Sequence, residues 1–467
     1  MRYKVLADKV AQDIHSARLS AGQRMPSLRR FCTQYEVSMS TALSCYRLLE
    51  QQGFIAAQPQ SGFYVLGQTP SDAPASPKFV PKVATQRSLR RAVSAGFSND
   101  GPFAISQLNP QYAPTEALQK SLRRGVAQMG ADVLQYPEQQ GAGVLRQALA
   151  AHFSPMGFAF NSEDLVISGG CMDAVRVCLL ACTKPGDRVA ISSPCFSGLL
   201  QLLLSMQRQV LEIPCTSDGI DLERLEQLMQ SGEVQAGLFS CSHMNPQGSS
   251  LSVQQKQYLA HLANQYKVPI IEDDVYAELS YQKQMPLPAK TWDTNGYVLW
   301  CGSVSKSLAA GLRLGWCLPG RYLPQVLLGY RMGNLGPSEL LQVGVADFIQ
   351  SGEYARHLQR TRERLLRHSS AYRRELKQLL PESSAVAQPT GGIVLWVQVK
   401  GLDAELLRQR AHEADINILA GAAFSTRRLY RDCFRINAGW DLSDRFDGQR
   451  TVHQALAQLA ELVHEQR

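Results

Sequence analysis

One lysine, Lys306, stands just beyond a short apolar run and among residues that suit a phosphate. The run Val298–Trp300 predicts a buried strand, and Ser303 and Ser305 precede the lysine in an S-x-S-K pattern. Arg313 follows within a G-x-R-x-G segment. An ammonium group desolvated at a strand end can deprotonate and attack an aldehyde, and a guanidinium with hydroxyls can hold a phosphate. The segment therefore predicts an imine-forming lysine beside a phosphate site.

Further segments place chemically useful residues where strands give way to turns. They are the acid run with Asp273 and Tyr276, the Asn245-Pro246 turn, the glycine-rich turn Ser168–Met172, Phe196 in a P-x-F-x-G pattern, and Arg435 in an apolar strand. A glycine-rich turn before a helix offers free N–H groups to a phosphate, and a buried guanidinium can grip a carboxylate. The structural alternatives are a helix cap at Asp274, an ordinary turn, a core phenylalanine and a surface ion pair.

In order and spacing these segments resemble the cofactor site of class I/II aminotransferases, which use pyridoxal 5′-phosphate. The resemblance implies that Lys306 forms the aldimine, that Asp273 faces the pyridine nitrogen, and that Tyr276 and Asn245 meet the phenolic oxygen. The phosphate would be held by Ser303, Ser305, Arg313, Gly170, Cys171 and Met172. The remaining implied roles are ring stacking for Phe196, binding of the substrate carboxylate for Arg435, and contact with a neighbouring subunit's phosphate for Tyr136.

Two positions depart from that pattern. The family often carries Ser and Gln where this chain has Cys171 and Met172, so backbone contacts to the phosphate remain while side-chain hydrogen bonds are lost. The role of Tyr136 implies a homodimer, and we expect the peptide bond before Pro246 to be cis.

Short apolar strands alternate with amphipathic helices beyond about residue 96. The strand candidates lie at 165–167, 188–191, 238–239, 268–271 and 298–300. This alternation predicts an α/β domain whose mostly parallel sheet is flanked by helices. The resemblance implies the fold type I of pyridoxal-phosphate-dependent transferases, with a smaller C-terminal α+β subdomain, over residues 96–467.

Residues 1–67 have a different pattern, with three apolar helical stripes followed by a hairpin. The segments Arg24–Arg29, Val37–Thr41, Leu49–Gly53 and Ser61–Val65 resemble the winged helix-turn-helix of GntR-type regulators. The implied partner is double-stranded DNA, and the candidate DNA contacts are Ser27, Arg29, Arg30, Ser38, Met39, Ser40, Thr41, Arg47, Gln60, Ser61 and Gly62. Met39 stands where the family usually has Arg, so no operator sequence is predicted. A solvated helix surface is the alternative for these side chains.

The positive charge of the chain lies almost entirely in its first fifth. Residues 1–67 hold eight Lys and Arg against four Asp and Glu, residues 68–95 hold five against one, and the rest is balanced. This distribution favours a polyanionic partner for the N-terminal part. Residues 68–95, with four prolines, predict an extended linker that does not pack.

Several protein classes are disfavoured by composition. No apolar run approaches the roughly 20 residues of a membrane-spanning helix, and the N-terminus resembles no signal peptide. Eleven cysteines without a C-x-x-C pair predict buried thiols in a reducing compartment and no metal site. We therefore expect a cytoplasmic protein.

The two halves in this order resemble the MocR subfamily of GntR regulators. The resemblance implies a dimeric DNA-binding transcription regulator that senses an amino acid or amine through an external aldimine. A catalytically active aminotransferase with an appended DNA-binding domain is the main alternative, and a cofactor-free dimerisation scaffold is another. Effector, operator and direction of regulation are not encoded in these motifs.

Overall fold

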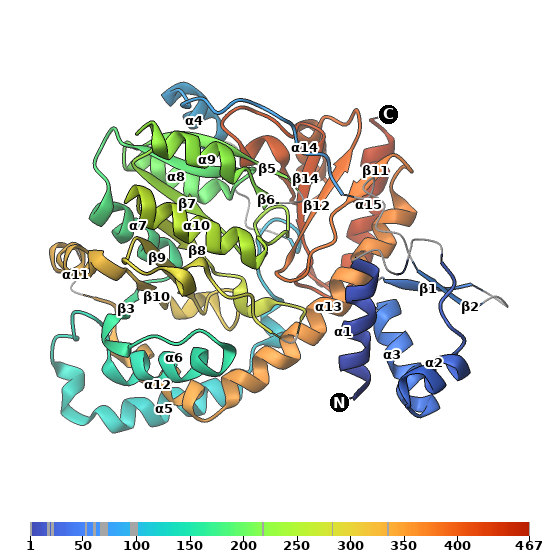
Figure 1. The fold of residues 1–467 in the computed structure, drawn as a ribbon, viewed down its shortest axis with the longest axis horizontal. Coiled ribbons are helices and arrows are strands. Elements are labelled where there is room, and N and C mark those ends of the chain that lie inside the picture. Colours follow the sequence, from blue (N-terminus) through green and yellow to red (C-terminus); the bar gives the residue numbers. More distant parts are fainter. Residues whose placement is uncertain are drawn as a thin grey trace.

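The computed structural model describes residues 2–15, 19, 23–51, 54–58, 62–65, 73–93, 101–216, 219–282, 284–333 and 336–466 of the 467-residue chain. Figure 1 shows a small N-terminal domain, a large lobe around a central sheet, and a smaller C-terminal lobe. The expected wing-tip contacts Gln60 and Ser61 lie outside the described residues, as do residues 68–72 and 94–100. Within those described ranges, no helix is long and apolar enough to cross a membrane.

The N-terminal domain is a winged helix-turn-helix, as the apolar stripes predict. It consists of α1 (Arg2–His15), α2 (Leu28–Tyr35), α3 (Met39–Gln51) and an antiparallel hairpin of β1 (Ile55–Gln58) and β2 (Gly62–Val65). Ser27 accepts a hydrogen bond from the Arg30 N–H at 3.3 Å, and Ser38 accepts one from the Thr41 N–H at 3.3 Å. Both serines therefore cap helices, since their hydroxyls satisfy N–H groups that lack intrahelical partners.

An aromatic core fixes the hairpin against the helices. Tyr46 on α3 packs edge-on against Phe31 and Phe63, with ring centroids 5.0 and 5.2 Å away, and its hydroxyl donates to the Pro26 carbonyl. The position of the wing relative to α3 is thus set by buried ring contacts from three elements.

The segment between the domains packs onto the large and small lobes, so the expectation of an unpacked linker is wrong for residues 73–93. The Ala84 N–H donates to the Val210 carbonyl at 2.8 Å, and the Ala75 N–H donates to the Gln398 side chain at 2.7 Å. Its helix α4 (Gln86–Val93) buries Leu89 against α8 (Ser197–Ser205). Backbone hydrogen bonds and one buried leucine outweigh the proline-rich composition that suggested an extended chain.

The large lobe is built on a mostly parallel eight-stranded sheet of order β3-β10-β9-β8-β7-β4-β5-β6, which confirms the α/β prediction. Strands β10 and β6 run antiparallel to their neighbours. In chain order the strands are β3 (Val166–Ser168), β4 (Arg188–Ser193), β5 (Gln209–Thr216), β6 (Gly219–Ile220), β7 (Ala236–Phe239), β8 (Ile270–Asp273), β9 (Val298–Ser303) and β10 (Gly315–Leu318).

Helices cover both faces of this sheet. The covering helices are α5 (Thr115–Met129), α6 (Gly143–Phe153), α7 (Cys171–Cys182), α8, α9 (Leu222–Gln230), α10 (Val253–Tyr266), α11 (Leu323–Met332) and α12 (Glu339–Gln350). Alternate residues of one strand join different cores: Ile191 packs with α7 and α8, while Ala190 packs with α9 and α10. Because side chains alternate along a strand, a sheet covered on both faces needs these continuous apolar runs.

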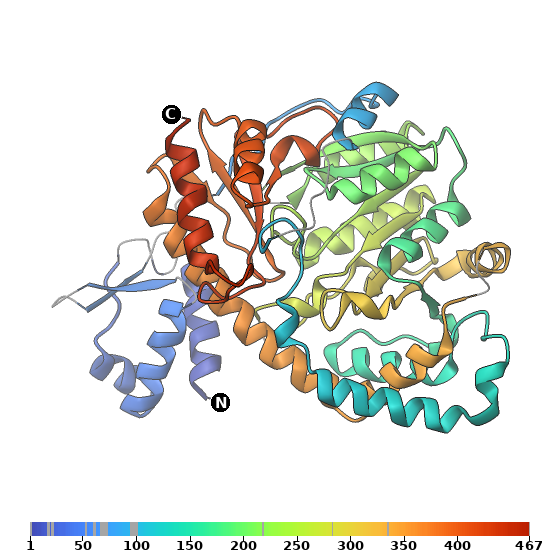
Figure 2. The same cartoon turned by 180° about the vertical axis from the view of Figure 1, so that it is seen from behind.

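The C-terminal lobe is an α+β subdomain. Its antiparallel sheet has the order β11 (Ser384–Val386), β12 (Val394–Val399), β14 (Cys433–Asn437), β13 (Leu419–Ala420), and it packs with α14 (Ala404–Glu413) and α15 (Val452–His464). The long helix α13 (Glu353–Leu379) joins this lobe to the large one, and Figures 1 and 2 place α1 of the N-terminal domain beside it. Lys4 on α1 and Glu363 on α13 form an exposed ion pair at 3.8 Å.

Candidate functional site

Parallel strands bring the expected cofactor-binding residues to one edge of the large sheet. Asp273 ends β8, and Ser303 ends the neighbouring strand β9 just before Lys306. Gly170 follows β3 at the same edge, because β10 connects β3 to β9. Ligands of open α/β sheets bind at such carboxyl ends, so the topology gathers residues more than 130 positions apart in the sequence.

Lys306 lies in a turn after β9 and is partly buried. Its Nζ donates to the Ser106 carbonyl at 2.6 Å. Desolvation, helped by nearby Arg435 and opposed by Asp273, lowers the pKa of Lys306 to about 8. Roughly a tenth of this amine is therefore unprotonated at pH 7, a much larger share than for an ordinary lysine, and the unprotonated amine is the form that attacks an aldehyde.

Ser106 is a site residue that sequence reasoning missed. Its carbonyl accepts from Lys306, and its hydroxyl shares a hydrogen bond with the Tyr276 hydroxyl at 2.6 Å. Burial raises the pKa of Tyr276 to about 12, which keeps the phenol protonated and able to donate. No local motif marks Ser106, because its contacts lie 170 and 200 residues away in sequence.

Asp273 is buried, and its carboxylate accepts a hydrogen bond from the Cys171 thiol, with Sγ and Oδ1 at 3.1 Å. Burial raises its pKa, while the thiol and the positive charge of Lys306 oppose that shift. Asp274 points elsewhere, since its Oδ2 accepts from the Trp300 indole N–H at 3.0 Å. The two adjacent acids therefore have different surroundings, and Asp273 is the one beside Lys306.

Asn245 is the first residue of the Asn-Pro turn that the sequence indicates. The Asn245–Pro246 peptide bond is cis, which confirms that expectation. Its side chain is buried beside Tyr276, and its Oδ1 atom has no hydrogen-bond partner in the described part of the chain. A buried polar atom without a partner is costly, so this side chain is suited to a polar ligand.

The glycine-rich turn and Arg313 form a cradle at the N-terminus of α7. Gly170 has φ 109° and caps the helix, and a Cβ atom placed there would lie 2.7 Å from the Arg313 guanidinium. Arg313 also donates to the Gly169 carbonyl at 3.0 Å. The first N–H groups of α7, which begins at Cys171 and Met172, have no intrahelical acceptors, so the cradle offers backbone donors and a guanidinium to an anion.

The other expected phosphate residues lie near this cradle or on its supporting strand. Ser303 is buried and accepts from the Ser305 N–H at 3.3 Å, which fixes the turn that carries Lys306. Ser305 is half-buried. The Cys171 side chain is directed to Asp273, so its thiol is already engaged by a carboxylate.

Phe196 and Tyr136 are placed differently from each other. Phe196 precedes α8, half-buried, with its ring over Gly198, where a Cβ would lie 2.4 Å from a ring carbon. Tyr136 is 86% exposed in this single chain, and Leu134 beside it is 84% exposed. Phe196 thus lies just after β4, at the carboxyl end of a strand of the same sheet, while the Tyr136 side chain is largely exposed to solvent in the single chain.

Arg435 lies in the central strand β14 of the small lobe and is only 1% exposed. One of its terminal nitrogens donates to the Ala104 carbonyl, while its Nε has no partner in the ranges the structure describes. Burial lowers its pKa to about 10, and the guanidinium still carries its charge at neutral pH. A buried guanidinium with an unused donor, facing the Lys306 region, suits a carboxylate.

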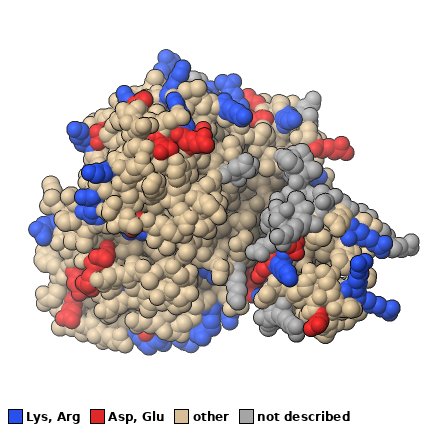
Figure 3. Space-filling view, in the orientation of Figure 1, with Lys and Arg blue, Asp and Glu red and all other residues tan. Residues whose placement is uncertain are grey.

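The described candidate DNA contacts of the N-terminal domain lie on α2 and α3, at the caps of these helices, and at the start of β2. Arg29, Arg30, Met39, Ser40 and Arg47 are exposed, and Ser27, Ser38 and Gly62 are also solvent-accessible while Thr41 is half-buried. Figure 3 shows blue side chains at the outer edge of this domain. Ser40 and Arg47 lie two turns apart on one helix face. Arg24, which is not among the predicted contacts, lies 3.6 Å from a Cβ placed at Gly62 and adds a cation at the wing.

Comparison with known proteins connects these two sites. Residues 104–444 match the family described as aminotransferase class I and II, and residues 2–65 match the gntR family of bacterial regulatory proteins. The chain is 33% identical to the "Uncharacterized HTH-type transcriptional regulator YdcR" of Escherichia coli (strain K12) and 32% identical to YjiR of the same organism, over 99% of both chains in each case. The chain is a GntR-family regulator of the MocR type.

Solved aminotransferases share the fold of the large part of this MocR-type regulator. A multiple substrate aminotransferase from Thermococcus profundus superposes with a TM-score of 0.69 at 23% identity, covering 82% of this chain and 96% of the other. A Pyrococcus horikoshii kynurenine aminotransferase gives 0.70 at 24% identity, covering 81% and 94%. These likenesses establish the fold of the domain.

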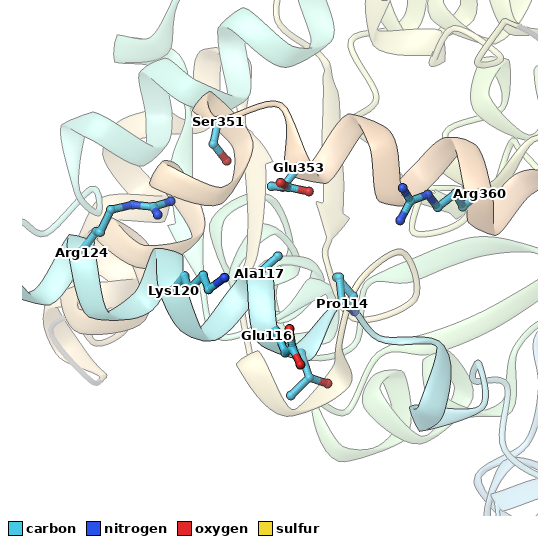
Figure 4. A pocket seen from close by; sticks show the side chains of 9 residues that line it. Pro114, Glu116, Ala117, Lys120, Arg124, Ser351, Glu353 and Arg360 are labelled. Carbon is cyan, nitrogen blue, oxygen red and sulfur yellow. The ribbon is translucent and has the colours of Figure 1, made fainter.

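A surface cavity of the large lobe is lined by other residues than this site. It has a volume of about 560 Å³ and is lined by Pro114, Thr115, Glu116, Ala117, Lys120, Arg124, Ser351, Glu353 and Arg360 (Figure 4). Its charges are largely matched within the chain, since Arg124 pairs with Asp347 at 2.6 Å and Glu353 pairs with Arg356 at 2.6 Å. None of its residues belongs to the set around Lys306.

Proposed function

We propose that the aminotransferase-like domain of this regulator binds pyridoxal 5′-phosphate on Lys306 and senses an amino acid or amine there. The regulator acts as a homodimer on operator DNA in this proposal. The observation that carries it is the position of Lys306, whose depressed pKa leaves a reactive amine between a buried carboxylate, Asp273, and a buried guanidinium, Arg435.

The residues present fit this cofactor at each of its polar groups. Gly170 and Arg313 offer a phosphate cradle that a Cβ atom would fill, and the orphaned Asn245 side chain lies beside the Tyr276 hydroxyl for the phenolic oxygen. Asp273 provides a buried carboxylate for the pyridine nitrogen. When bound, the cofactor supplies an aldehyde that reacts with amines and a ring that accepts electrons.

The ligand class follows from the charges around Lys306. An incoming amine competes with the Lys306 amine for the same aldehyde. Arg435, with its unused Nε donor, holds the carboxylate at the other end of the ligand. An α-amino acid satisfies both groups, while a simple amine satisfies only the first. We therefore expect amino acids to bind more tightly than amines without a carboxylate.

The homodimer is supported by Tyr136 and its surroundings. Tyr136, Leu134 and Met332 are 86%, 84% and 80% exposed, although large apolar side chains usually avoid solvent in clusters. Gln139 bridges the Tyr136 loop to α11 by donating to the Leu327 carbonyl at 2.7 Å. A second copy would cover this surface and receive Tyr136 at its own phosphate cradle.

Helix α13 supports coupling between the lysine and the DNA-binding domain. Ser307, next to Lys306, shares a hydrogen bond with the Tyr354 hydroxyl at 2.7 Å, and its carbonyl lies 2.9 Å from His357 Nε2. Two turns further along α13, Glu363 meets Lys4 of α1. A ligand that moves the Lys306 turn therefore acts on the helix that touches the DNA-binding domain, and coupling requires unequal ligand contacts in two arrangements.

The test combines cofactor absorbance with DNA affinity in the full chain. Wild-type protein is titrated with pyridoxal phosphate and then with single amino acids, and binding to its own upstream DNA is measured by fluorescence anisotropy at several salt concentrations. We expect a cofactor absorbance band that changes with one ligand class and a matching change in DNA affinity. The Lys306→Ala variant should bind DNA without responding to ligand. An unchanged ligand response in that variant contradicts the proposal.

An active aminotransferase is the second candidate, because Lys306, Asp273, Tyr276, Asn245 and Arg435 include the groups that transamination needs. Formation of the keto acid from the ligand, followed in the same samples, distinguishes the two. Turnover in many cycles without an effect on DNA binding would favour the enzyme over the sensor.

A further inference from the structure

Cys171 is the first residue of α7 and faces Asp273 across the end of the sheet. Its Sγ lies 3.1 Å from Asp273 Oδ1, and the two side chains are 8% and 6% exposed. An ionised carboxylate only accepts hydrogen bonds, so the thiol is the donor in this pair. Burial raises the pKa of the Cys171 thiol well above its ordinary value, which keeps the donor protonated.

We propose that Cys171 is the positioning residue that orients Asp273 and keeps it ionised toward the ring nitrogen of the cofactor. This inference rests on the proposed function, since it assigns a role within the same cofactor site. In this role Cys171 acts through Asp273, which accepts the hydrogen bond of its thiol.

The surroundings of Asp273 show why one hydrogen bond matters there. Burial favours the neutral acid, and neighbouring Asp274 acts in the same direction. Opposing them are the Cys171 thiol, the Val275 N–H and the charge of Lys306. The thiol is therefore one of three groups that stabilise the charged form of Asp273 against its burial, and it is the only side-chain hydrogen-bond donor among them.

The neighbouring thiols do not share this role. Cys178 lies two turns further along α7 and contacts Cys301, with the sulfur atoms 3.8 Å apart, and both residues are fully buried. The described contacts of Cys178 do not include Asp273. Cys178 is therefore a matched control, because its replacement removes a buried thiol from the same helix without changing the carboxylate contact.

The experiment compares wild type with Cys171→Ala, Cys171→Ser and Cys178→Ala in the full chain. The dissociation constant of pyridoxal phosphate and the absorbance spectrum of the loaded protein are measured for each. Loss of a hydrogen bond to a charged group predicts roughly tenfold weaker cofactor binding and an altered spectrum for Cys171→Ala. Cys171→Ser should restore both, since a hydroxyl also donates, and Cys178→Ala should keep the wild-type spectrum.

A double-mutant cycle with Asp273→Asn tests whether Cys171 acts through Asp273. We expect Cys171→Ala to have no further effect on cofactor affinity or spectrum in the Asp273→Asn background. Equal effects of Cys171→Ala in both backgrounds, or a Cys171→Ala protein indistinguishable from wild type, overturn the inference. A wild-type protein that shows no cofactor band at all overturns the proposed function together with it, so the two failures are distinguishable.

Discussion

The Lys306 amine donates to the backbone carbonyl of Ser106, 200 residues earlier in the chain, at a distance of 2.6 Å. The same short segment occupies Arg435 through the Ala104 carbonyl. The Lys306 amine and one terminal nitrogen of Arg435 thus both donate to carbonyls of one stretch of backbone, while the Arg435 Nε has no partner in the described residues. A ligand that takes up the Lys306 amine therefore competes with a backbone carbonyl of this stretch.

Lys306 should make the cofactor-free protein less stable at neutral pH. Its pKa is lowered in the folded state, so the unfolded state binds more protons between pH about 8 and the ordinary lysine pKa, and stability rises with pH in that range. We expect Lys306→Met to raise the free energy of unfolding by about 1–2 kcal/mol below pH 8, with the gain vanishing at higher pH. Urea unfolding at several pH values measures it, with exposed Lys120→Met as the control. A gain that is independent of pH contradicts this assignment.

Gly170 should be required by the cofactor cradle and not only by its backbone conformation. Gly170→Ala places a Cβ 2.7 Å from Arg313, and we expect at least tenfold weaker binding of pyridoxal phosphate, together with a loss of about 1 kcal/mol in stability from backbone strain. Gly186 has a similar φ of 92° with no atom within 4 Å of an added Cβ. Gly186→Ala should therefore lose comparable stability while keeping cofactor affinity, as measured by spectroscopic titration. Equal affinities of the two variants would show that the cradle is elsewhere.

Arg29 and Arg30 should set DNA affinity through phosphate contacts. Replacing either by Ala is expected to weaken binding to all sequences about equally and to reduce the slope of log affinity against log salt by about one. Lys184→Ala, an exposed change on the large lobe, provides the control. Anisotropy titrations between low and moderate salt measure the slope, and an unchanged slope in the Arg variants would place the DNA elsewhere.

Tyr354 should transmit ligand binding to α13. Its hydroxyl bonds to Ser307 and to Glu278, each at 2.7 Å, so Tyr354→Phe removes one of the two hydrogen bonds between Ser307 and the helix and leaves the contact of His357 with the Ser307 carbonyl. We expect cofactor binding to persist while the ligand-induced change in DNA affinity falls by about 1 kcal/mol of coupling. Tyr372→Phe is matched to it, because the Tyr372 hydroxyl on the same helix has no hydrogen-bond partner in the described structure. If both variants lose the effect of ligand on DNA affinity, the cause would be a general loss of stability in α13 and not the Ser307 contact.

The sequence predicts the parts of this molecule that depend on local patterns. The alternation of strands and helices predicts the parallel sheet, and the residues at its carboxyl edge, such as Asp273 and Lys306, follow from turns next to apolar runs. Ser27 and Ser38 were recognisable as caps because their acceptors and donors lie three residues apart.

Contacts between distant segments could not be predicted in this way. Ser106 has no motif of its own, and its role is created by folding residues 101–109 against β8 and β9. The prediction of an unpacked linker is based on the prolines of residues 68–95, whereas residues 73–93 pack through contacts with distant segments, such as those of Val83 with β5 and Leu89 with α8. One buried leucine gives no periodic apolar pattern from which packing of this segment could be predicted.

Because residues 73–93 pack against both lobes, the DNA-binding part cannot be cut from the aminotransferase-like part at residue 96 without loss of these contacts. Removal of everything before residue 96 would strip Leu89 from the large lobe's core, open the edge of β5 at Leu211 and free the Arg427 side chain that donates to Val80. A cut at residue 96 therefore removes contacts from both lobes. A domain exchange would therefore keep residues 73–93 with the two lobes and would join the DNA-binding domain before residue 73.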